Sequence, residues 1–219
     1  MKIGVIRLIV FLLGITTVSF AQENTAKKLL DEVSNTMNAY KNLELSFSSS
    51  LTNEDAGIKE GDEPPNKGNI ILSGEKYHLQ FLGNDFIFNG KTMFIINHEE
   101  QEITTNNGDF EEDDGFIYPS KLLTFYKEGY NFKMGKIATI KGKKIQFVIL
   151  TPIDSNSDIV NVELGIETKT KHIYTLIQTG SNSSKTRITI TSFKSNQNIQ
   201  DSIFTVDTAA YEKKDYSID

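Results

Sequence analysis

The chain has 219 residues, no cysteine and no tryptophan, and its 23 basic and 29 acidic residues give a formal net charge of −6. The absence of cysteine excludes disulfides and thiolate metal sites. The negative charge argues against nucleic acid and against anionic membrane surfaces as partners.

The N-terminus has the pattern of a secretory signal sequence. Lys2 and Arg7 precede an apolar run, and Ser19-Phe20-Ala21 ends it with small residues where a signal peptidase cleaves. The apolar run is too short to span a bilayer. We therefore expect residues 1–21 to be removed and residues 22–219 to form one soluble domain in the periplasm.

The spacing of apolar residues predicts one helix followed by many strands. Apolar residues recur at helical spacing from Ala26 to Tyr40, and from Leu43 the period changes to two. Short apolar runs separated by glycine-containing turns then continue to a last possible strand at Ile203–Val206. We count about eleven strands. The expected fold is mainly β with few helices (α+β), with a strongly curved antiparallel sheet that forms an incomplete barrel.

The stretch from Phe88 to Ile103 contains fragments of two chemical motifs. Gly90-Lys91-Thr92 matches the end of a phosphate-binding loop, but a β run follows it instead of a helix. His98-Glu99 matches the start of a zinc-protease helix, but Glu102 stands where the second histidine belongs. We interpret the stretch as part of two hairpins, with Asn89-Gly90 as a tight turn in which both residues have positive φ.

No other motif predicts chemistry. The three histidines, His78, His98 and His172, are scattered, and no nucleophile-elbow pattern is present. The acidic loop Asp109–Asp114 lacks the glycine and glutamate of a calcium-binding loop, so we expect it to be solvated. We expect no cofactor, no metal and no enzymatic activity.

A short apolar helix is predicted between Pro119 and Gly129, because proline favours a helix start and glycine a helix end. Two interpretations of it stay open: ordinary core packing, or a lid over a concave sheet that leaves room for an apolar ligand. The candidate lid residues are Leu122, Leu123, Phe125 and Tyr126.

Several stretches together resemble the periplasmic carriers of outer-membrane lipoproteins, the LolA-like proteins. Asn89–Phe94 is similar to the family's (D/N)GKT hairpin, and Pro119–Tyr130 resembles its lid segment. Val148–Pro152 and Ile203–Asp207 match two further family stretches in the same order, and the helix leading into Leu43–Phe47 resembles the family's opening.

The resemblance implies a fold and a function. The fold would be an incomplete β-barrel with helices as a lid over a hydrophobic cavity. The function would be to receive acylated lipoproteins from an inner-membrane transporter and to deliver them to an outer-membrane acceptor. One departure is that Ser73-Gly74 stands where the family has an arginine followed by proline, so we expect no arginine that locks the lid.

On this hypothesis one face of the strands binds the acyl chains. The choice of face depends on register, because a shift of one residue exchanges every inward side chain for an outward one. The predicted cavity residues are Leu45, Phe47, Ile70, Leu72, Tyr77, Leu79, Phe81, Phe86, Phe88, Phe94 and Ile96. Two alternatives remain: a carrier or sensor of another envelope lipid, glycolipid or pigment, and an exported interaction module with a solid core. We expect a monomer in each case.

Overall fold

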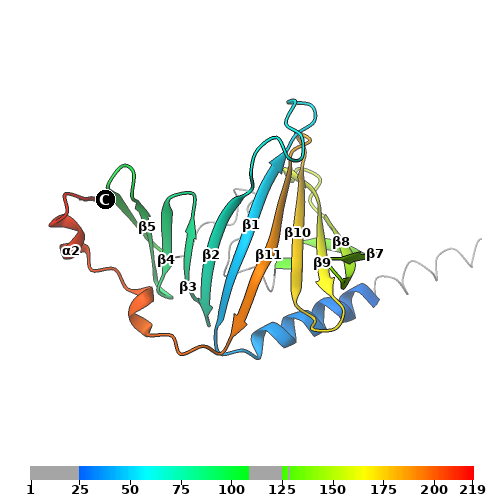
Figure 1. Cartoon of the computed structure of the whole chain (residues 1–219), viewed down its shortest axis with the longest axis horizontal. Helices are drawn as coiled ribbons and strands as arrows, with labels where there is room; N and C mark the ends of the chain where they lie inside the picture. Colours follow the sequence, from blue (N-terminus) through cyan, green and yellow to red (C-terminus); the bar gives the residue numbers. More distant parts are fainter. Residues whose placement is uncertain (1–24, 109–124, 128) are drawn as a thin grey trace, which may run out of the picture.

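The computed structural model describes residues 25–108, 125–127 and 129–219, and a single sheet of 12 strands dominates it (Figure 1). The strand order is β12-β6-β5-β4-β3-β2-β1-β11-β10-β9-β8-β7, and all neighbours are antiparallel except β12 and β6. The end strands β12 and β7 do not pair in the described part of the chain. The sheet is therefore unclosed, which confirms the expected incomplete barrel.

The strands follow one another along the chain with short turns in most places. They are β1 (Leu43–Thr52), β2 (Asn66–Ser73), β3 (Lys76–Phe81), β4 (Asn84–Phe88), β5 (Thr92–Asn97), β6 (Glu102–Asn107), β7 (Tyr130–Ile140), β8 (Lys143–Pro152), β9 (Ile159–Glu167), β10 (Ile173–Gly180), β11 (Lys185–Ser195) and β12 (Ser217–Ile218). The helical segments are an N-terminal helix (25–38), η1 (Phe125–Lys127), η2 (Asp201–Phe204) and α2 (Thr208–Glu212).

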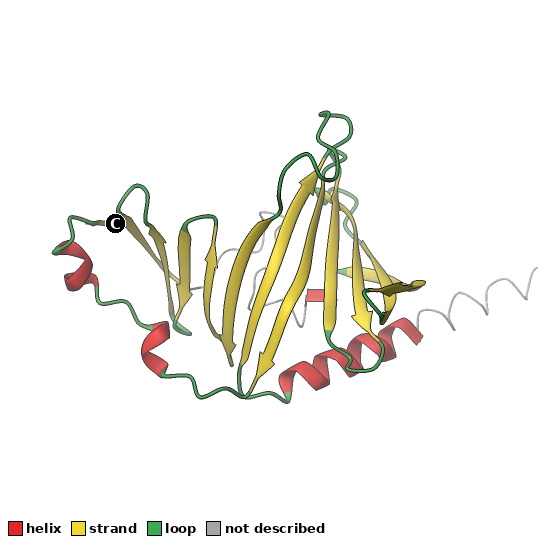
Figure 2. Ribbon diagram, in the orientation of Figure 1, coloured by secondary structure: helices red, strands yellow, loops and turns green. Residues whose placement is uncertain are grey.

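The N-terminal helix forms where the helical spacing predicts it. Its buried stripe packs against one face of the sheet, which we call the inner face, and consists of Ala26, Leu29, Leu30, Val33 and Met37. Figure 2 shows the helix beside β9 and β10, far from the C-terminus.

Two polar contacts join the helix region to the turn between β9 and β10. Nζ of Lys171 lies 2.9 Å from Oε2 of Glu32, and the hydroxyl of Tyr40 lies 2.9 Å from Nε2 of His172. The ring of His172 also stacks on Phe193 at a centroid distance of 3.8 Å. Polar and aromatic contacts therefore fix the position of the helix on this half of the sheet.

The C-terminal segment differs from the prediction. Ile203–Val206 is not a strand, because Asp201–Phe204 forms the 3-10 helix η2 and Phe204 is buried. A run of four residues is too short for its spacing to distinguish a strand from a helical turn. The chain then continues through α2 and ends as β12, which pairs with β6.

The opposite face of the sheet, the outer face, has its own small core beneath this segment. Ile87, Ile96 and Ile103 are buried there. The partly buried side chains that pack on them are Phe94, Val206, Tyr211, Tyr216 and Ile218. Strands β4 and β5 thus have apolar residues on both faces.

Candidate functional site

The inner face of β1–β5 is built from three parallel rows of side chains that cross the strands. In the first row, Leu43 pairs with Leu72, Leu72 with Tyr77, Tyr77 with Phe88, and Phe88 with Met93. All five residues of this row are buried. The Tyr77 hydroxyl points at the Met93 sulfur at 3.9 Å, and the rings of Tyr77 and Phe88 lie 5.8 Å apart. This row is a closed part of the core.

The second row is less covered. It runs from Leu45 through Ile70, Leu79 and Phe86 to Ile95. Leu45 and Ile70 are buried, whereas the other three residues are only partly buried. Within this row, coverage therefore decreases from β1 and β2 toward β5.

The third row lies nearest the β3–β4 turn and is the most open. Phe47 pairs with Gly68, and Gly68 pairs with Phe81. Both phenylalanines are partly exposed, and their ring centroids lie 5.4 Å apart. A Cβ on Gly68 would collide with the far edge of the Phe47 ring, so that ring occupies the space that a side chain at position 68 would need.

The three rows contain no charged side chain, and their apolar surface continues past the buried part of the core. A packed core that simply ended would place polar side chains where the burial ends, because exposed positions on a half-buried sheet are normally polar. The second row instead carries aliphatic and aromatic side chains in partly exposed positions, and so does the third row on β1 and β3. The third row becomes polar only on β4 and β5, at Asn84 and Asn97. This arrangement suits an apolar ligand.

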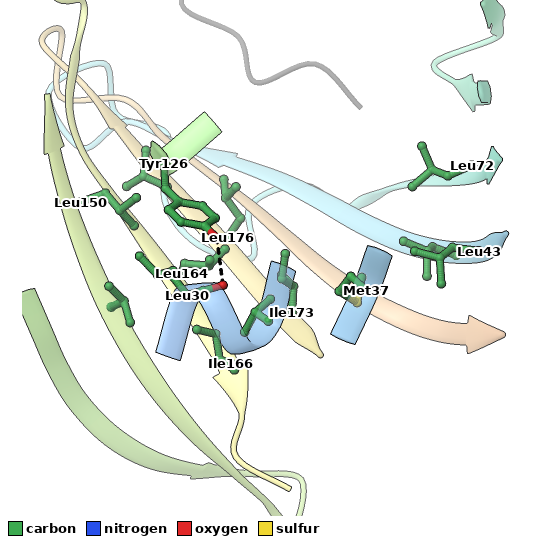
Figure 3. Close-up of a cluster of buried hydrophobic side chains, with 14 of the residues drawn as sticks. Leu30, Met37, Leu43, Leu72, Tyr126, Leu150, Leu164, Ile166, Ile173 and Leu176 are labelled. Carbon is green, nitrogen blue, oxygen red and sulfur yellow. Dashed lines mark hydrogen bonds between the residues drawn. The ribbon is translucent and has the colours of Figure 1, made fainter. Parts of the chain in front are cut away.

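The remaining part of the inner face packs against the N-terminal helix. Figure 3 shows Leu30 of the helix among Leu164, Ile166 and Leu176 of β9 and β10, with Tyr126 beside them. All of these residues belong to the same buried cluster as the first row. The helix therefore covers one half of the inner face, and the open rows lie on the other half.

Tyr126 is the one predicted lid residue whose side chain the structure describes. It is buried, and its hydroxyl donates a hydrogen bond of 3.0 Å to the carbonyl oxygen of Leu30 (Figure 3). Burial raises the pKa of Tyr126 above its usual value. Phe125 is the first residue of η1, and Leu122 and Leu123 lie outside the described residues. The end of the predicted lid segment is thus attached to the helix.

Most of the predicted cavity residues lie in the three rows, namely Leu45, Phe47, Ile70, Leu72, Tyr77, Leu79, Phe81, Phe86 and Phe88. The inner-face placement of Phe94 and Ile96 was wrong. Both lie on the outer face, because Phe88 pairs with Met93 and the next residues alternate from there. Met93 and Ile95 take their places, and ligand binding by any of these residues stays a prediction.

The Asn89-Gly90 turn is also wider than predicted. Gly90 has a φ of 93°, but Asn89 is not in a positive-φ conformation. The side-chain oxygen of Asn89 accepts hydrogen bonds from the backbone N–H groups of Lys91 and Thr92, at 2.9 and 2.8 Å. The loop therefore extends beyond two residues, and the asparagine acts through its side chain.

A polar cluster on the outer face contains two of the histidines. Nε2 of His98 lies 3.0 Å from Oδ2 of Asp85, and Nδ1 of His98 lies 3.0 Å from the Tyr216 hydroxyl. Nε2 of His78 lies 3.4 Å from Oδ1 of Asp85, a longer contact. Burial raises the pKa of Asp85, but its interactions with His78, His98 and Gln80 outweigh this and hold the pKa well below its usual value.

This cluster joins β4 to the C-terminal segment and offers no evident chemistry. The described residues contain no group of three or more metal-ligating side chains that could hold a metal ion. The cluster also lies on the face opposite the apolar rows. We interpret it as structural. None of the helices in the described part of the chain is long and apolar enough to span a membrane.

Comparisons with known proteins identify the fold only. No protein-family model matches the chain, and no curated protein does. An uncharacterized conserved protein from Thermus thermophilus is similar in structure, with a TM-score of 0.59 and 9% identity over 89% of this chain and 98% of that chain. MucB is similar with a TM-score of 0.51 and 12% identity, over 84% of this chain and 63% of that chain.

A LolA superfamily protein from Nitrosomonas europaea also matches, with a TM-score of 0.44 and 9% identity over 84% of this chain and 98% of that chain. This likeness is too distant to carry an argument by itself. The architecture agrees with the one that the sequence resemblance implied, because an unclosed antiparallel sheet holds a helix against its inner face. The chain has a LolA-like fold.

Proposed function

We propose that this protein is a periplasmic carrier that binds the acyl chains of lipoproteins on its inner face. The observation that supports the proposal best is the partly exposed apolar surface of the second and third rows, which includes Phe47, Leu79, Phe81, Phe86 and Ile95. In the proposed cycle an inner-membrane transporter supplies the lipoprotein, and an outer-membrane acceptor receives it.

The physical need for such a carrier follows from the cargo. Each methylene group that leaves a membrane for water costs about 0.8 kcal/mol, so a lipoprotein with several acyl chains does not cross an aqueous compartment unaided. The open rows provide apolar area from phenylalanine side chains, which lose little conformational entropy when a ligand orders them. Release requires moderate affinity, and partial coverage of the rows is consistent with that requirement. We propose that no covalent chemistry takes part.

The first experiment is native mass spectrometry of the mature protein, residues 22–219, purified from its own periplasm and followed by lipid extraction. Bound acylated lipoprotein supports the proposal and identifies the cargo. A free lipid, glycolipid or pigment keeps a lipid-binding role but changes the cargo. A protein that is empty and also fails to bind an apolar fluorescent dye contradicts the proposal.

A matched pair of variants tests whether the inner face binds the ligand. Phe81→Lys places a charge in the third row, and Gln80→Lys places the same charge on the preceding residue, which faces the other side of β3. We expect Phe81→Lys to weaken dye and lipopeptide binding at least tenfold, whereas Gln80→Lys leaves both unchanged. Equal effects of the two variants would mean that the inner face is not the binding surface.

A protein-binding role is the competing class. MucB has a similar fold, and a further MucB structure, with a TM-score of 0.48, contains MucA(peri) as a partner. That score is too low to carry an argument about this chain. Pull-down of a protein without lipid, together with no binding of an apolar dye, would favour an interaction module over a carrier.

A further inference from the structure

One hairpin of this acidic protein is rich in lysine. Strands β7 and β8 and the turn between them contain five lysines and no acidic residue, although the chain as a whole has a net charge of −6. The turn, Lys141-Gly142, has positive φ at both residues, 48° and 78°. It is a tight two-residue hairpin turn that projects its lysines from the end of the sheet.

The neighbouring turn adds to this charge. The N–H of Thr168 donates to the carbonyl of Lys144 at 3.0 Å, so the β9–β10 turn lies directly beside the β7–β8 hairpin. Lys141, Lys144 and Lys169 are exposed, and none of them has an ion pair among the described residues. We call these three residues the basic end.

Two other lysines nearby are already neutralised. Nζ of Lys143 lies 2.8 Å from Oε2 of Glu167, and Lys171 pairs with Glu32. The acidic groups near the basic end are therefore engaged. Its three lysines remain available to an external anion.

The hairpin also exposes an aliphatic side chain. Ile137 is 57% exposed and follows the exposed Lys136 in β7, which is the last strand of the sheet. A surface that mixes lysines with aliphatic groups is typical of segments that lie at a membrane interface. All five cations of the hairpin are lysines, whose compact charges suit diffuse attraction better than bidentate recognition of one carboxylate.

The opposite end of the sheet has the opposite charge. The β1–β2 loop carries Glu54, Asp55, Glu60, Asp62 and Glu63, and all five are exposed. β9 alone has nine residues and separates the two ends by about 30 Å. This exceeds the Debye length of about 8 Å at physiological ionic strength. Salt thus screens the acidic end from a surface that contacts the basic end, and the net charge does not describe the local attraction.

We propose that the basic end docks this protein on the surface of an anionic phospholipid bilayer. The contact orients the molecule with its acidic β1–β2 loop away from the membrane. Docking does not depend on the cargo, because the basic end lies outside the three apolar rows. The expectation from net charge, that the chain avoids anionic surfaces, is then wrong for this one end.

Vesicle co-sedimentation tests the proposal with the mature protein. The vesicles contain either phosphatidylcholine alone or phosphatidylcholine with phosphatidylglycerol. We expect binding only to the anionic vesicles, and weaker binding as sodium chloride rises. Each lysine near an anionic surface contributes roughly a fivefold change in partition coefficient, so the triple variant K141Q/K144Q/K169Q should bind on the order of 100-fold more weakly.

A matched triple variant at the other end is the control. K59Q/K67Q/K185Q removes the same charge from three exposed lysines and should leave vesicle binding unchanged. Ile137→Ser should weaken binding without altering its salt dependence. Equal loss in both triple variants, or equal binding to neutral vesicles, would overturn the proposal. So would a wild-type protein that ignores vesicles and binds an acidic protein through the same lysines.

The same variants separate this proposal from the proposed function. The basic-end triple variant should keep full dye and lipopeptide binding, because its substitutions are remote from the rows. If the wild type binds anionic vesicles but no apolar ligand, the carrier function fails and the docking surface stands. If the wild type binds an apolar ligand but no anionic vesicles, the docking proposal fails and the carrier function stands.

Discussion

Alanine substitutions at two glycines provide a sensitive test of how open the third row is. Gly68 and Gly165 both lie in strands without positive φ, so alanine fits the backbone at either position. A Cβ at Gly68 would collide with Cζ of Phe47, and a Cβ at Gly165 would lie 2.7 Å from Cγ2 of Thr175. The difference lies in what those neighbours can do.

At Gly68 the obstructing atoms are the far edge of one partly exposed ring. The Phe47 ring can rotate away and loses its contact with Phe81, which costs roughly 0.5–1.5 kcal/mol. Replacing a strand glycine by alanine contributes about 0.5–1 kcal/mol in the opposite direction. We therefore expect the free energy of unfolding of Gly68→Ala to stay within about 1 kcal/mol of the wild type.

At Gly165 the neighbours cannot move away. The new Cβ would lie 2.7 Å from Thr175 and 3.1 Å from both Ile145 and Phe147, and all three residues are buried. Overpacking of this kind costs about 1–3 kcal/mol, and the gain of about 0.5–1 kcal/mol from replacing a strand glycine offsets part of it. A net loss of about 2 kcal/mol corresponds, for a domain of this size, to a melting temperature lower by roughly 4–8 °C.

Urea unfolding followed by circular dichroism gives both free energies, and dye titration gives the ligand effect. Gly68→Ala should be near the wild type in stability but should change dye affinity, because the displaced Phe47 ring changes the shape of the third row. Gly165→Ala should lose stability and keep its dye affinity under folding conditions. If Gly68→Ala is as destabilised as Gly165→Ala, the Phe47 ring is fixed and our description of an open third row is wrong.

Three further predictions concern single contacts. Tyr126→Phe removes the hydrogen bond to Leu30 and should lower the unfolding free energy by about 1 kcal/mol in urea titrations; an unchanged midpoint would mean that the bond contributes nothing. The pKa of Asp85 is lower in the folded protein than in the unfolded chain, so its ionised carboxylate stabilises the fold above the ordinary aspartate pKa. This stabilisation is lost as the pH falls through the pKa that Asp85 has in the folded protein. Asp85→Asn should therefore be less stable than the wild type at pH 7, and the gap should shrink in acid. Burial lowers the pKa of His172, so protonation favours the unfolded chain. Wild-type melting temperature should fall between pH 7 and pH 5, and His172→Gln should reduce that fall; parallel curves would contradict the assignment.

Sequence patterns were sufficient for the helix and for most strands. The buried stripe from Ala26 to Met37 has one clear period, and glycine-containing turns punctuate β2–β5. These features are local, because residues close in sequence determine them. They also placed most of the inner-face rows correctly, since each strand from β1 to β4 has a dominant apolar face.

The sequence pattern could not show which residues of β5 point to the inner face. Met93, Phe94, Ile95 and Ile96 are consecutive apolar residues, so the alternation that identifies a face is absent. The reason is in the fold: the inner-face core covers Met93, and the C-terminal segment covers the outer side at Ile96. A strand with apolar cover on both sides contains no information about which side is which.

The bulge in β7 depends on a side-chain contact across the β7–β8 hairpin. Gln146 is buried in β8, and its side-chain nitrogen donates to the carbonyls of Gly135 and Phe147, both at 2.9 Å. These bonds hold the β-bulge of β7, where the register shifts between Met134 and Ile137. The sequence shows only a lone glutamine in an apolar strand, and its hydrogen-bond partners become apparent only in the folded sheet.

Contacts between distant parts of the chain also explain why the two faces of the sheet differ in how far they are covered. On the outer face, the C-terminal segment follows the last long strand, crosses back over β3 through η2, and pairs its end with β6. That cover is continuous with the sheet, and Ile96 and Ile103 are fully buried beneath it. On the inner face the N-terminal helix covers only one half, so the second and third rows keep exposed apolar area. The partial exposure of the rows is therefore the observation on which the proposed apolar ligand rests.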